Sequence, residues 1–360
     1  MSVSENNMTD DEDFMELALL LAFPRKRKMF LERPNHFTKW RDDQFFNRFR
    51  LSKNTVYFIL DHIKERIASP TNRNNAVTPE QKLLITLRYY ATGSFLTVCG
   101  DFVGVHKSTA SQIIRLVSHE LALLRPTFIN FPSNSAEIDS IRQKFYNVSK
   151  FPKCVGAIDC THVRIISPGG VDSEIYRNRK GYFSINVQTI CDADLRIQNI
   201  VATFPGSNHD STIFNYSSIR GKFERGEMKD SILVGDSGYA LKTFLMTPFL
   251  NPTGDGQNTY NEAQIRTRNA VERSYGVWKK RFPVLAVGIN MKLESVESII
   301  VATAVLHNIA CYFGEETPRV THQLEKIIDL STFSTRGTVN NVNEYGTLQR
   351  NKLVRYFESL

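Results

Sequence analysis

The amino-acid sequence predicts an α/β protein in which a mixed β-sheet is flanked by helices and is preceded by an all-helical region. Three observations support this fold class. Apolar residues recur at helical spacing from residue 13 to about 128, strand-like apolar runs begin after Pro152, and helical patterns return beyond residue 262. Strands followed by flanking helices are typical of a sheet whose two faces are both covered.

Composition narrows the class of protein further. The chain has 360 residues, of which 41% are hydrophobic, so it can bury a sizeable core and has room for two domains. Its formal charge of +8 and pI of about 9.2 favour a polyanionic partner. The five cysteines are odd in number and form no C-x-x-C pair, which argues against a disulfide scaffold or a zinc site and indicates a reducing compartment.

The sequence also bears on location. No apolar run approaches the roughly 20 residues of a membrane span, and the run at 17–23 follows acidic residues, unlike a signal peptide. We therefore expect no membrane association and a location in the nucleus, with the cytoplasm as a second compartment. The basic run PRKRK at 24–28 is equally compatible with a nuclear-import patch and with a solvated loop.

The pattern along the chain suggests five segments. We expect a disordered acidic tail at 1–12, a helical region at 13–130, a connecting segment at 131–152, the main α/β domain at 153–313 and a C-terminal extension at 314–360 that ends in a helix over 348–360. Within the main domain, strands are predicted at 155–166, 183–192, 195–204 and 232–234, and helices at 262–281 and 294–313.

The helical region contains a candidate helix-turn-helix. A short helix is predicted at 94–103, a turn at Gly104 and Val105, and a longer helix at 107–124. The outer side of the second helix would present residue types suited to phosphates and base edges, so we take these as candidate DNA contacts: Lys107, Ser108, Ser111, Gln112 and Arg115. A plain helical hairpin with a polar face remains the alternative.

Three acidic residues stand at positions where a charged carboxylate is expected to be energetically unfavourable. Asp159 lies inside an apolar strand pattern, and Asp236 directly follows another. A carboxylate in such a place needs a partner or a metal, although either aspartate alone could simply cap a strand end. Glu272 shares a helix face with Arg268 and Lys279, which we take as further candidate DNA contacts. The plain alternative is an exposed Arg–Glu pair worth about 0.3–0.5 kcal/mol.

Four ordered motifs resemble those of PIF/Harbinger transposases and their domesticated nuclease relatives. They are VGAIDCTH at 155–162, FPGSNHDS at 204–211, LVGDSGY at 233–239 and RNAVERSYGVWKKRF at 268–282. Thirty-five residues lie between Asp236 and Glu272, which resembles the spacing of a DDE triad. The similarity covers roughly residues 151–310, and the helical part upstream also looks alike.

The resemblance implies an RNase H-like fold and a metal-dependent nuclease that hydrolyses DNA phosphodiester bonds by a two-metal mechanism. By position, Asp159, Asp236 and Glu272 would be both the catalytic residues and the ligands of Mg²⁺ or Mn²⁺. A Myb-like DNA-binding partner protein is also implied.

The resemblance leaves the roles of two residues undecided, namely Asp210 and His162. Asp210 would be either an auxiliary acid or the N-cap of a helix, and we favour the cap. His162 could approach a phosphate, although a histidine satisfied by a neighbouring side chain is the simpler interpretation.

The alternatives within this family are an active Harbinger transposase and a DNA-binding or adaptor protein that does not use its acids. An unrelated α/β hydrolase would be expected to carry a G-x-S-x-G, Walker A or G-x-G-x-x-G motif, and the sequence has none of the three.

Overall fold

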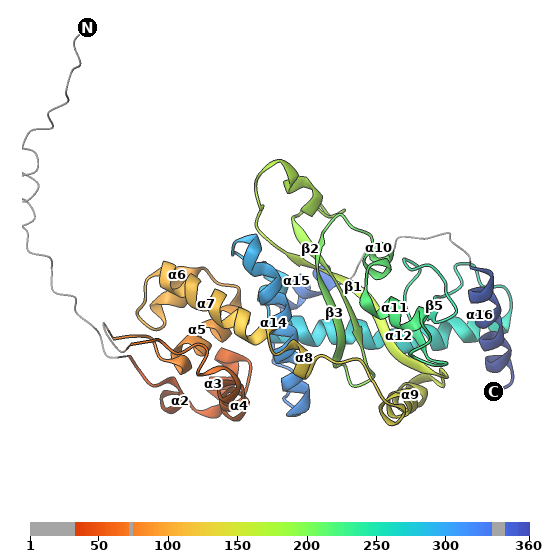
Figure 1. Cartoon of the computed structure of the whole chain (residues 1–360), viewed down its shortest axis with the longest axis horizontal. Helices are drawn as coiled ribbons and strands as arrows, with labels where there is room; N and C mark the ends of the chain where they lie inside the picture. Colours follow the sequence, from red (N-terminus) through yellow and green to blue (C-terminus); the bar gives the residue numbers. More distant parts are fainter. Residues whose placement is uncertain (1–32, 72–74, 333–342) are drawn as a thin grey trace, which may run out of the picture.

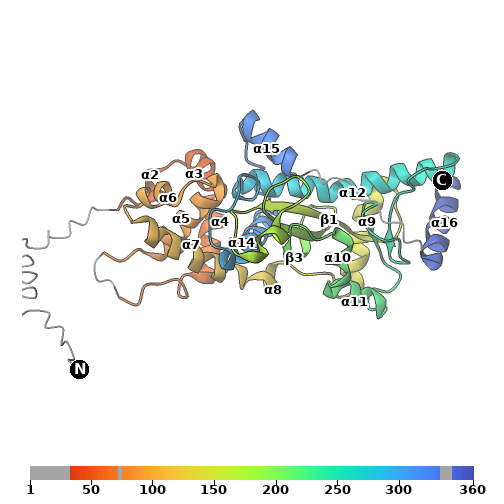
Figure 2. The ribbon, with the colours of Figure 1, turned by 90° about the horizontal axis from the view of Figure 1, so that it is seen from above.

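The structure, a computed structural model, describes residues 33–71, 75–332 and 343–360. The predicted acidic tail at 1–12, the start of the helical region and the basic run at 24–28 lie outside these residues. A helical region stands at one end of the molecule, a mixed sheet in the middle and helix α16 (Glu344–Glu358) at the other end (Figures 1 and 2). The α/β class with an all-helical N-terminal region is therefore confirmed.

The helical region is a series of helices, several of which have a side-chain N-cap. Its members are α2 (His36–Lys39), α3 (Asp42–Phe49), α4 (Lys53–Ile63), α5 (Pro79–Thr92), α6 (Leu96–Asp101), α7 (Lys107–Ala122) and α8 (Arg125–Phe128). Ser52 caps α4, and Thr78 with Gln81 forms a capping box on α5, because these side chains satisfy amide groups that have no partner within the helix. Gly104 has a positive φ of 67° in the turn between α6 and α7, which confirms the predicted helix, turn and helix.

The central sheet has five strands in the order β3-β2-β1-β4-β5. They are β1 (Cys154–Arg164), β2 (Ser184–Cys191), β3 (Ile197–Pro205), β4 (Ile232–Val234) and β5 (Leu245–Met246). The first three form an antiparallel meander, whereas β1, β4 and β5 run parallel. A tight turn joins β2 and β3, and in it Asp192 accepts the amide protons of Asp194 and Arg196, both at 2.9 Å.

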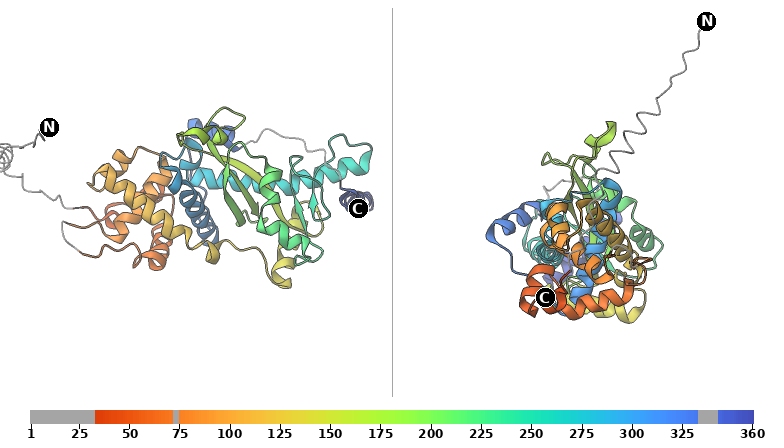
Figure 3. Two further views of the ribbon diagram at one scale, coloured as in Figure 1. Left: turned by 45° about the horizontal axis from the view of Figure 1, so that its top comes forward. Right: turned by 90° about the vertical axis from the view of Figure 1, so that its left-hand side faces the viewer.

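Helices cover the sheet and join it to the rest of the chain. They are α9 (Ser135–Ser149), α10 (Asp210–Asn215), α11 (Ser218–Glu224), α12 (Asp255–Arg281), α13 (Val284–Val287), α14 (Leu293–Tyr312) and α15 (His322–Thr332), with a 3₁₀ turn η1 at Val171–Tyr176. Helix α12 packs on β1 and β2 and extends to α16, while α14 packs on both α7 and β3 (Figures 1 and 3). The buried apolar residues form one connected cluster, so the proposed domain limits stay a prediction.

Among the described residues, α14 is the one helix long and apolar enough to cross a membrane by length and composition. Inside this structure, however, 78% of its apolar stretch is buried. The contacts of α14 with α7 and β3 account for that composition without a membrane. The expectation that no segment approaches such a length therefore overlooked this core helix.

Helix α15 covers a buried lysine at the end of α12. The Nζ atom of Lys279 donates to Thr161 Oγ1 at 2.6 Å and to the backbone oxygen of Ser331 at 2.9 Å, and its side chain is fully buried. Lys180 donates to the neighbouring backbone oxygen of Leu330 at 2.7 Å. Burial, together with the positive charge of Lys180, lowers the pKa of Lys279 to about 7.

The lack of space around Gly156, a glycine inside β1, predicts that a larger side chain there would destabilise the fold. A Cβ atom at Gly156 would lie 2.5 Å from Ile190 Cγ2, so Gly156→Ala should lower the free energy of unfolding by about 1–3 kcal/mol through overpacking. A Cβ atom at Gly276, on α12, would instead project into open space among the described residues, and Gly276→Ala should raise the same quantity by about 0.5–1 kcal/mol. Urea unfolding measures both, and equal effects of the two substitutions would contradict this packing.

The lowered pKa of Lys279 predicts that the free energy of unfolding depends on pH. Between its folded pKa of about 7 and its usual value of 10.5, the unfolded chain binds a proton that the folded chain does not. Stability therefore rises with pH across this window, by about 2–3 kcal/mol between pH 7 and 9. Lys279→Met should flatten the rise by that amount, whereas Lys280→Met, at a half-buried neighbour paired with Glu325, should keep the wild-type slope. Denaturant midpoints at several pH values decide between these outcomes.

Candidate metal centre

Asp159 is held in the middle of the sheet by contacts from three elements. It lies on β1 opposite Thr189 of β2 and is only 6% exposed. The hydroxyl of Tyr275, on α12, donates to the backbone oxygen of Asp159 at 2.6 Å and accepts from Thr189 Oγ1 at 3.0 Å. One carboxylate oxygen of Asp159 accepts the amide proton of Cys160 at 2.8 Å. These contacts fix the position of the carboxylate before any ion binds.

The parallel pairing of β1 and β4 brings Asp236 beside Asp159. Ala157 pairs with Val234, and each aspartate lies two residues beyond its member of this pair. The pairing of these parallel strands therefore brings the two side chains close together, at the point where β4 has ended and β1 continues. Asp236 is 8% exposed and accepts the amide proton of Gly238 at 2.9 Å.

Asp210 joins the two aspartates from the start of α10. Asn186, a buried residue of β2, donates to Asp210 Oδ1 and to the backbone oxygen of Asn208, both at 2.9 Å. The favoured interpretation of Asp210 as an N-cap is wrong, because His209 holds the capping position and Asp210 is the first helical residue. The hydrogen bonds from Asn186 hold the Asp210 carboxylate within the acidic group.

The three aspartates form a compact acidic group. Asp159, Asp210 and Asp236 each offer a carboxylate oxygen, and these atoms lie within 4.8 Å of one another. Burial raises the pKa of Asp159 well above its usual range, and the charge of Asp236 raises it further. An all-oxygen donor set with excess negative charge fits a hard divalent cation such as Mg²⁺ or Mn²⁺. The residues present are thus suited to at least one such ion.

Glu272 is connected to this acidic group by an arginine that contacts both. Arg268 Nη1 lies 2.8 Å from Asp159 Oδ2, and Arg268 Nη2 donates to Glu272 Oε1 one helical turn further along α12. The Glu272 side chain is 31% exposed, and Glu272 is not among the three residues of the compact group. The structure therefore gathers the predicted acids in one region, while the tight cluster contains Asp210. The role of Glu272 as a ligand stays a prediction.

Two of the predicted DNA contacts do not face solvent. Arg268 is 8% exposed and its guanidinium is engaged by Asp159 and Glu272. Lys279 is fully buried beneath α15. Helical spacing placed both on the face of Glu272, but it could not show that the sheet and α15 cover that face. Similarly, His162 is satisfied by Ser184 Oγ at 3.1 Å, as the simpler interpretation proposed.

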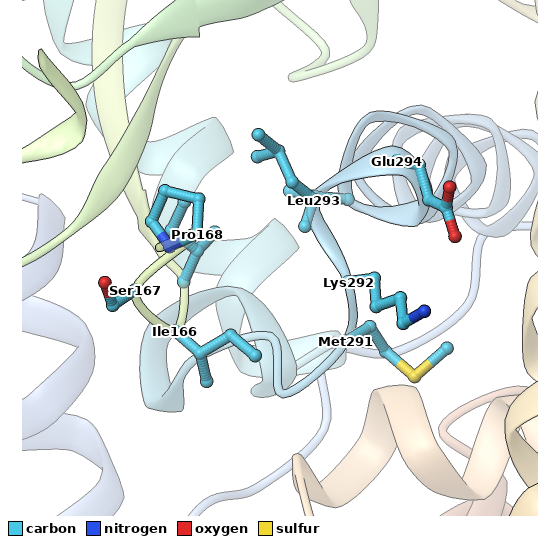
Figure 4. Close-up of a pocket in the computed structure, with 9 residues that line it drawn as sticks. Ile166, Ser167, Pro168, Met291, Lys292, Leu293 and Glu294 are labelled. Carbon is cyan, nitrogen blue, oxygen red and sulfur yellow. The ribbon is translucent and has the colours of Figure 1, made fainter. Parts of the chain in front are cut away.

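The candidate contacts on α7 lie beside a groove. Lys107, Ser108, Gln112 and Arg115 are exposed, whereas Ser111 is half-buried against Met291. A hollow of about 200 Å³ is bounded by α7 and residues 291–295, and an adjoining hollow of about 360 Å³ lies between this segment and residues 165–168 (Figure 4). The two hollows share three lining residues: Met291, Lys292 and Glu294.

Sequence reasoning underrated Asp210, and one signal could have found it. Asn186 and Gln188 occupy alternate positions of β2, a strand that is buried along its whole length. Gln188 donates to the backbone oxygen of Asp210 at 3.3 Å. Buried amide side chains require polar partners, so their presence on β2 indicates a polar segment packed against that strand.

Comparisons with known proteins identify the family of this chain. Residues 158–308 match the family described as DDE superfamily endonuclease. "Putative nuclease HARBI1" from Homo sapiens and from Rattus norvegicus are each 32% identical over 276 residues, covering 76% of this chain and 79% of the relative. "Protein ALP1-like" from Arabidopsis thaliana is 28% identical over 295 residues, covering 76% of this chain and 72% of the relative. No solved structure matches the chain significantly.

The matched residues begin at Ile158, directly before Asp159, and continue past Glu272, so they include every acid of the candidate centre. The identity and coverage shared with the HARBI1 proteins extend over most of both chains. The chain therefore belongs to the Harbinger transposase-derived nucleases of the DDE superfamily.

Proposed function

We propose that this protein is a divalent-metal-dependent endonuclease that hydrolyses phosphodiester bonds in DNA. The observation that carries the proposal is the compact group of Asp159, Asp210 and Asp236, in which the pairing of the parallel strands β1 and β4 brings the two buried aspartates, Asp159 and Asp236, together. Buried carboxylates that repel one another are costly unless a cation joins them. Membership of a nuclease family makes DNA the natural substrate.

Each acid has a proposed role. Asp159 and Asp236 hold the metal, Asp210 completes the donor set at the first position, and Glu272 contributes to a second position. Bound Mg²⁺ or Mn²⁺ would supply an activated water and stabilise the departing oxygen of the phosphodiester. The protein fixes the acids in place: Tyr275 holds the backbone of Asp159, and Asn186 holds Asp210.

The DNA surface is proposed to include the exposed face of α7. Gln112 and Arg115 line the groove between α7 and residues 291–295, and Lys107 is exposed at the start of the same helix. Arg115 lies 3.9 Å from Glu294, with both side chains well exposed, so this pair is weak and easily exchanged for a phosphate. Lys279 would reach DNA only after α15 moved, because the last turn of that helix lies over it.

The second candidate is a protein that binds DNA and does not cut it. The contact of Arg268 with both Asp159 and Glu272 favours it, since an ion pair already neutralises part of the acidic group. Titration calorimetry with Mn²⁺ separates the two functions, because an unused centre would give no metal-dependent heat while DNA binding persisted.

Location and partner are proposals that rest on family membership. We propose that the protein acts in the nucleus, with the cytoplasm as a second compartment. A Myb-like DNA-binding protein is proposed as its partner, and an active transposase acting on its own transposon ends remains the alternative within the family.

Removal of one buried acid should abolish cleavage. Asp159→Asn or Asp236→Asn should slow Mg²⁺- or Mn²⁺-dependent nicking of supercoiled plasmid at least about 100-fold, equivalent to about 2.7 kcal/mol of transition-state stabilisation. The matched control is Asp255→Asn, at an exposed aspartate that begins α12, and it should nick at the wild-type rate. Equal nicking by wild type and the two site variants would reject the assigned centre.

Loss of a phosphate contact on α7 should alter the salt dependence of DNA binding. Lys107→Ala should weaken binding to all sequences alike and reduce the slope of log K against log salt by about 1. Lys352→Ala, at an exposed lysine on α16 at the opposite end of the molecule, should leave the slope unchanged (Figure 1). Fluorescence anisotropy in EDTA measures binding without cleavage, and indistinguishable slopes for the two variants would exclude Lys107 from the interface.

A further inference from the structure

Arg268 lies between the acidic group and Glu272. Its burial distinguishes it from an arginine that forms an ordinary ion pair on the protein surface. Its side chain is 10% exposed, and its two terminal nitrogens contact carboxylates from different elements, Asp159 of β1 and Glu272 of α12. Arg266 on the same helix shows what spacing alone produces. It pairs with Glu262 at the same four-residue spacing, but both side chains are more than half exposed.

The guanidinium joins the two carboxylates that a second metal ion would share. Asp159 divides its oxygens, because Oδ1 accepts the amide proton of Cys160 while Oδ2 is bound by Arg268. In two-metal phosphoryl chemistry the two ions lie about 3.5–4 Å apart, so that one carboxylate would be able to serve both ions through its two oxygens. Asp159 contacts Arg268 and also belongs to the compact group with Asp210 and Asp236, whereas Glu272 lies outside that group and contacts Arg268.

We propose that Arg268 occupies the second cation position, so that the protein alone binds one divalent ion and takes up the second only when DNA draws Arg268 away. This inference rests on the proposed nuclease function and concerns how the same centre is loaded. The first ion would bind at Asp159, Asp210 and Asp236, which are already gathered. The second would require the Asp159 and Glu272 oxygens that Arg268 now holds.

Charge balance supports this order. The four carboxylates carry four negative charges and Arg268 one positive charge, so one divalent ion leaves the centre with a single negative charge. A second ion beside an unmoved arginine would leave a net positive charge in a largely buried place, which is unfavourable. A DNA phosphate would restore neutrality and would offer the guanidinium two oxygens in the fork geometry that arginine prefers.

A competing anion can release Arg268, whereas deprotonation of its guanidinium cannot. A guanidinium stays protonated throughout the physiological range, so its bond to Asp159 cannot be broken by its own deprotonation. The aliphatic part of the side chain is long enough to swing while the backbone of α12 stays packed on β1. The DNA backbone is the anion that a nuclease brings to this place.

The number of bound Mn²⁺ ions tests the proposal directly. Electron paramagnetic resonance of free Mn²⁺, titrated against wild type without DNA, should give one tight site per chain. Arg268→Gln should give two, with the affinity of the second site raised at least about 10-fold. Arg266→Gln is the matched control and should keep one site. Addition of a short DNA duplex to wild type should raise the count to two.

Contrary results have distinct meanings. Two tight sites in DNA-free wild type, or one site in Arg268→Gln, would overturn the role of Arg268 while leaving the nuclease proposal intact. No site in wild type, together with no nicking, would overturn the proposed function itself.

A second variant covers the case in which Arg268→Gln does not fold. Glu272→Gln keeps the contact between Arg268 and Asp159, and it should retain the first ion but fail to gain the second when DNA is added. Loss of the first ion in Glu272→Gln, or a second ion gained on DNA, would equally overturn the proposal.

Discussion

The pairing of β1 with β4 places two carboxylates side by side in a buried part of the protein. Much of the surrounding structure stabilises them there. Asp159 and Asp236 are both largely buried, and each disfavours the charge of the other. Three hydrogen-bond donors stabilise the two carboxylates: the amide groups of Cys160 and Gly238 and the guanidinium of Arg268. Negative charge is thus retained at a defined point at the expense of stability, as is common at catalytic centres.

The central elements could be predicted from sequence because their patterns are local. The apolar runs around Asp159 and before Asp236 predict buried strands, and Thr78 with Gln81 marks a helix start. Element limits were less accurate. Helix α12 begins at Asp255, seven residues before the predicted start at 262, because its first turns are polar. Contacts with α16, far along the chain, help to stabilise these turns, and a local pattern cannot report such contacts.

The same distinction explains the candidate site. Asp159 and Asp236 were identifiable because an acid inside an apolar run stands out in sequence. The contribution of Asp210 depends on Asn186 of β2, and the burial of Lys279 depends on α15, some fifty residues further along the chain. Helix periodicity gives the direction in which a side chain points, but not which later segment covers it. The unexpected burial of Arg268 and of Lys279, both predicted to face DNA, has this origin.

Helix α12 carries Arg268, Glu272, Tyr275 and Lys279 on one continuous rod of 27 residues. Insertion or deletion of a single residue within this stretch would turn everything beyond it by about 100°. The acid, its counter-ion and the tyrosine that anchors β1 would then lose their alignment together. We therefore expect relatives to differ at this centre by substitution alone, with length variation collected in the loops on either side of α12.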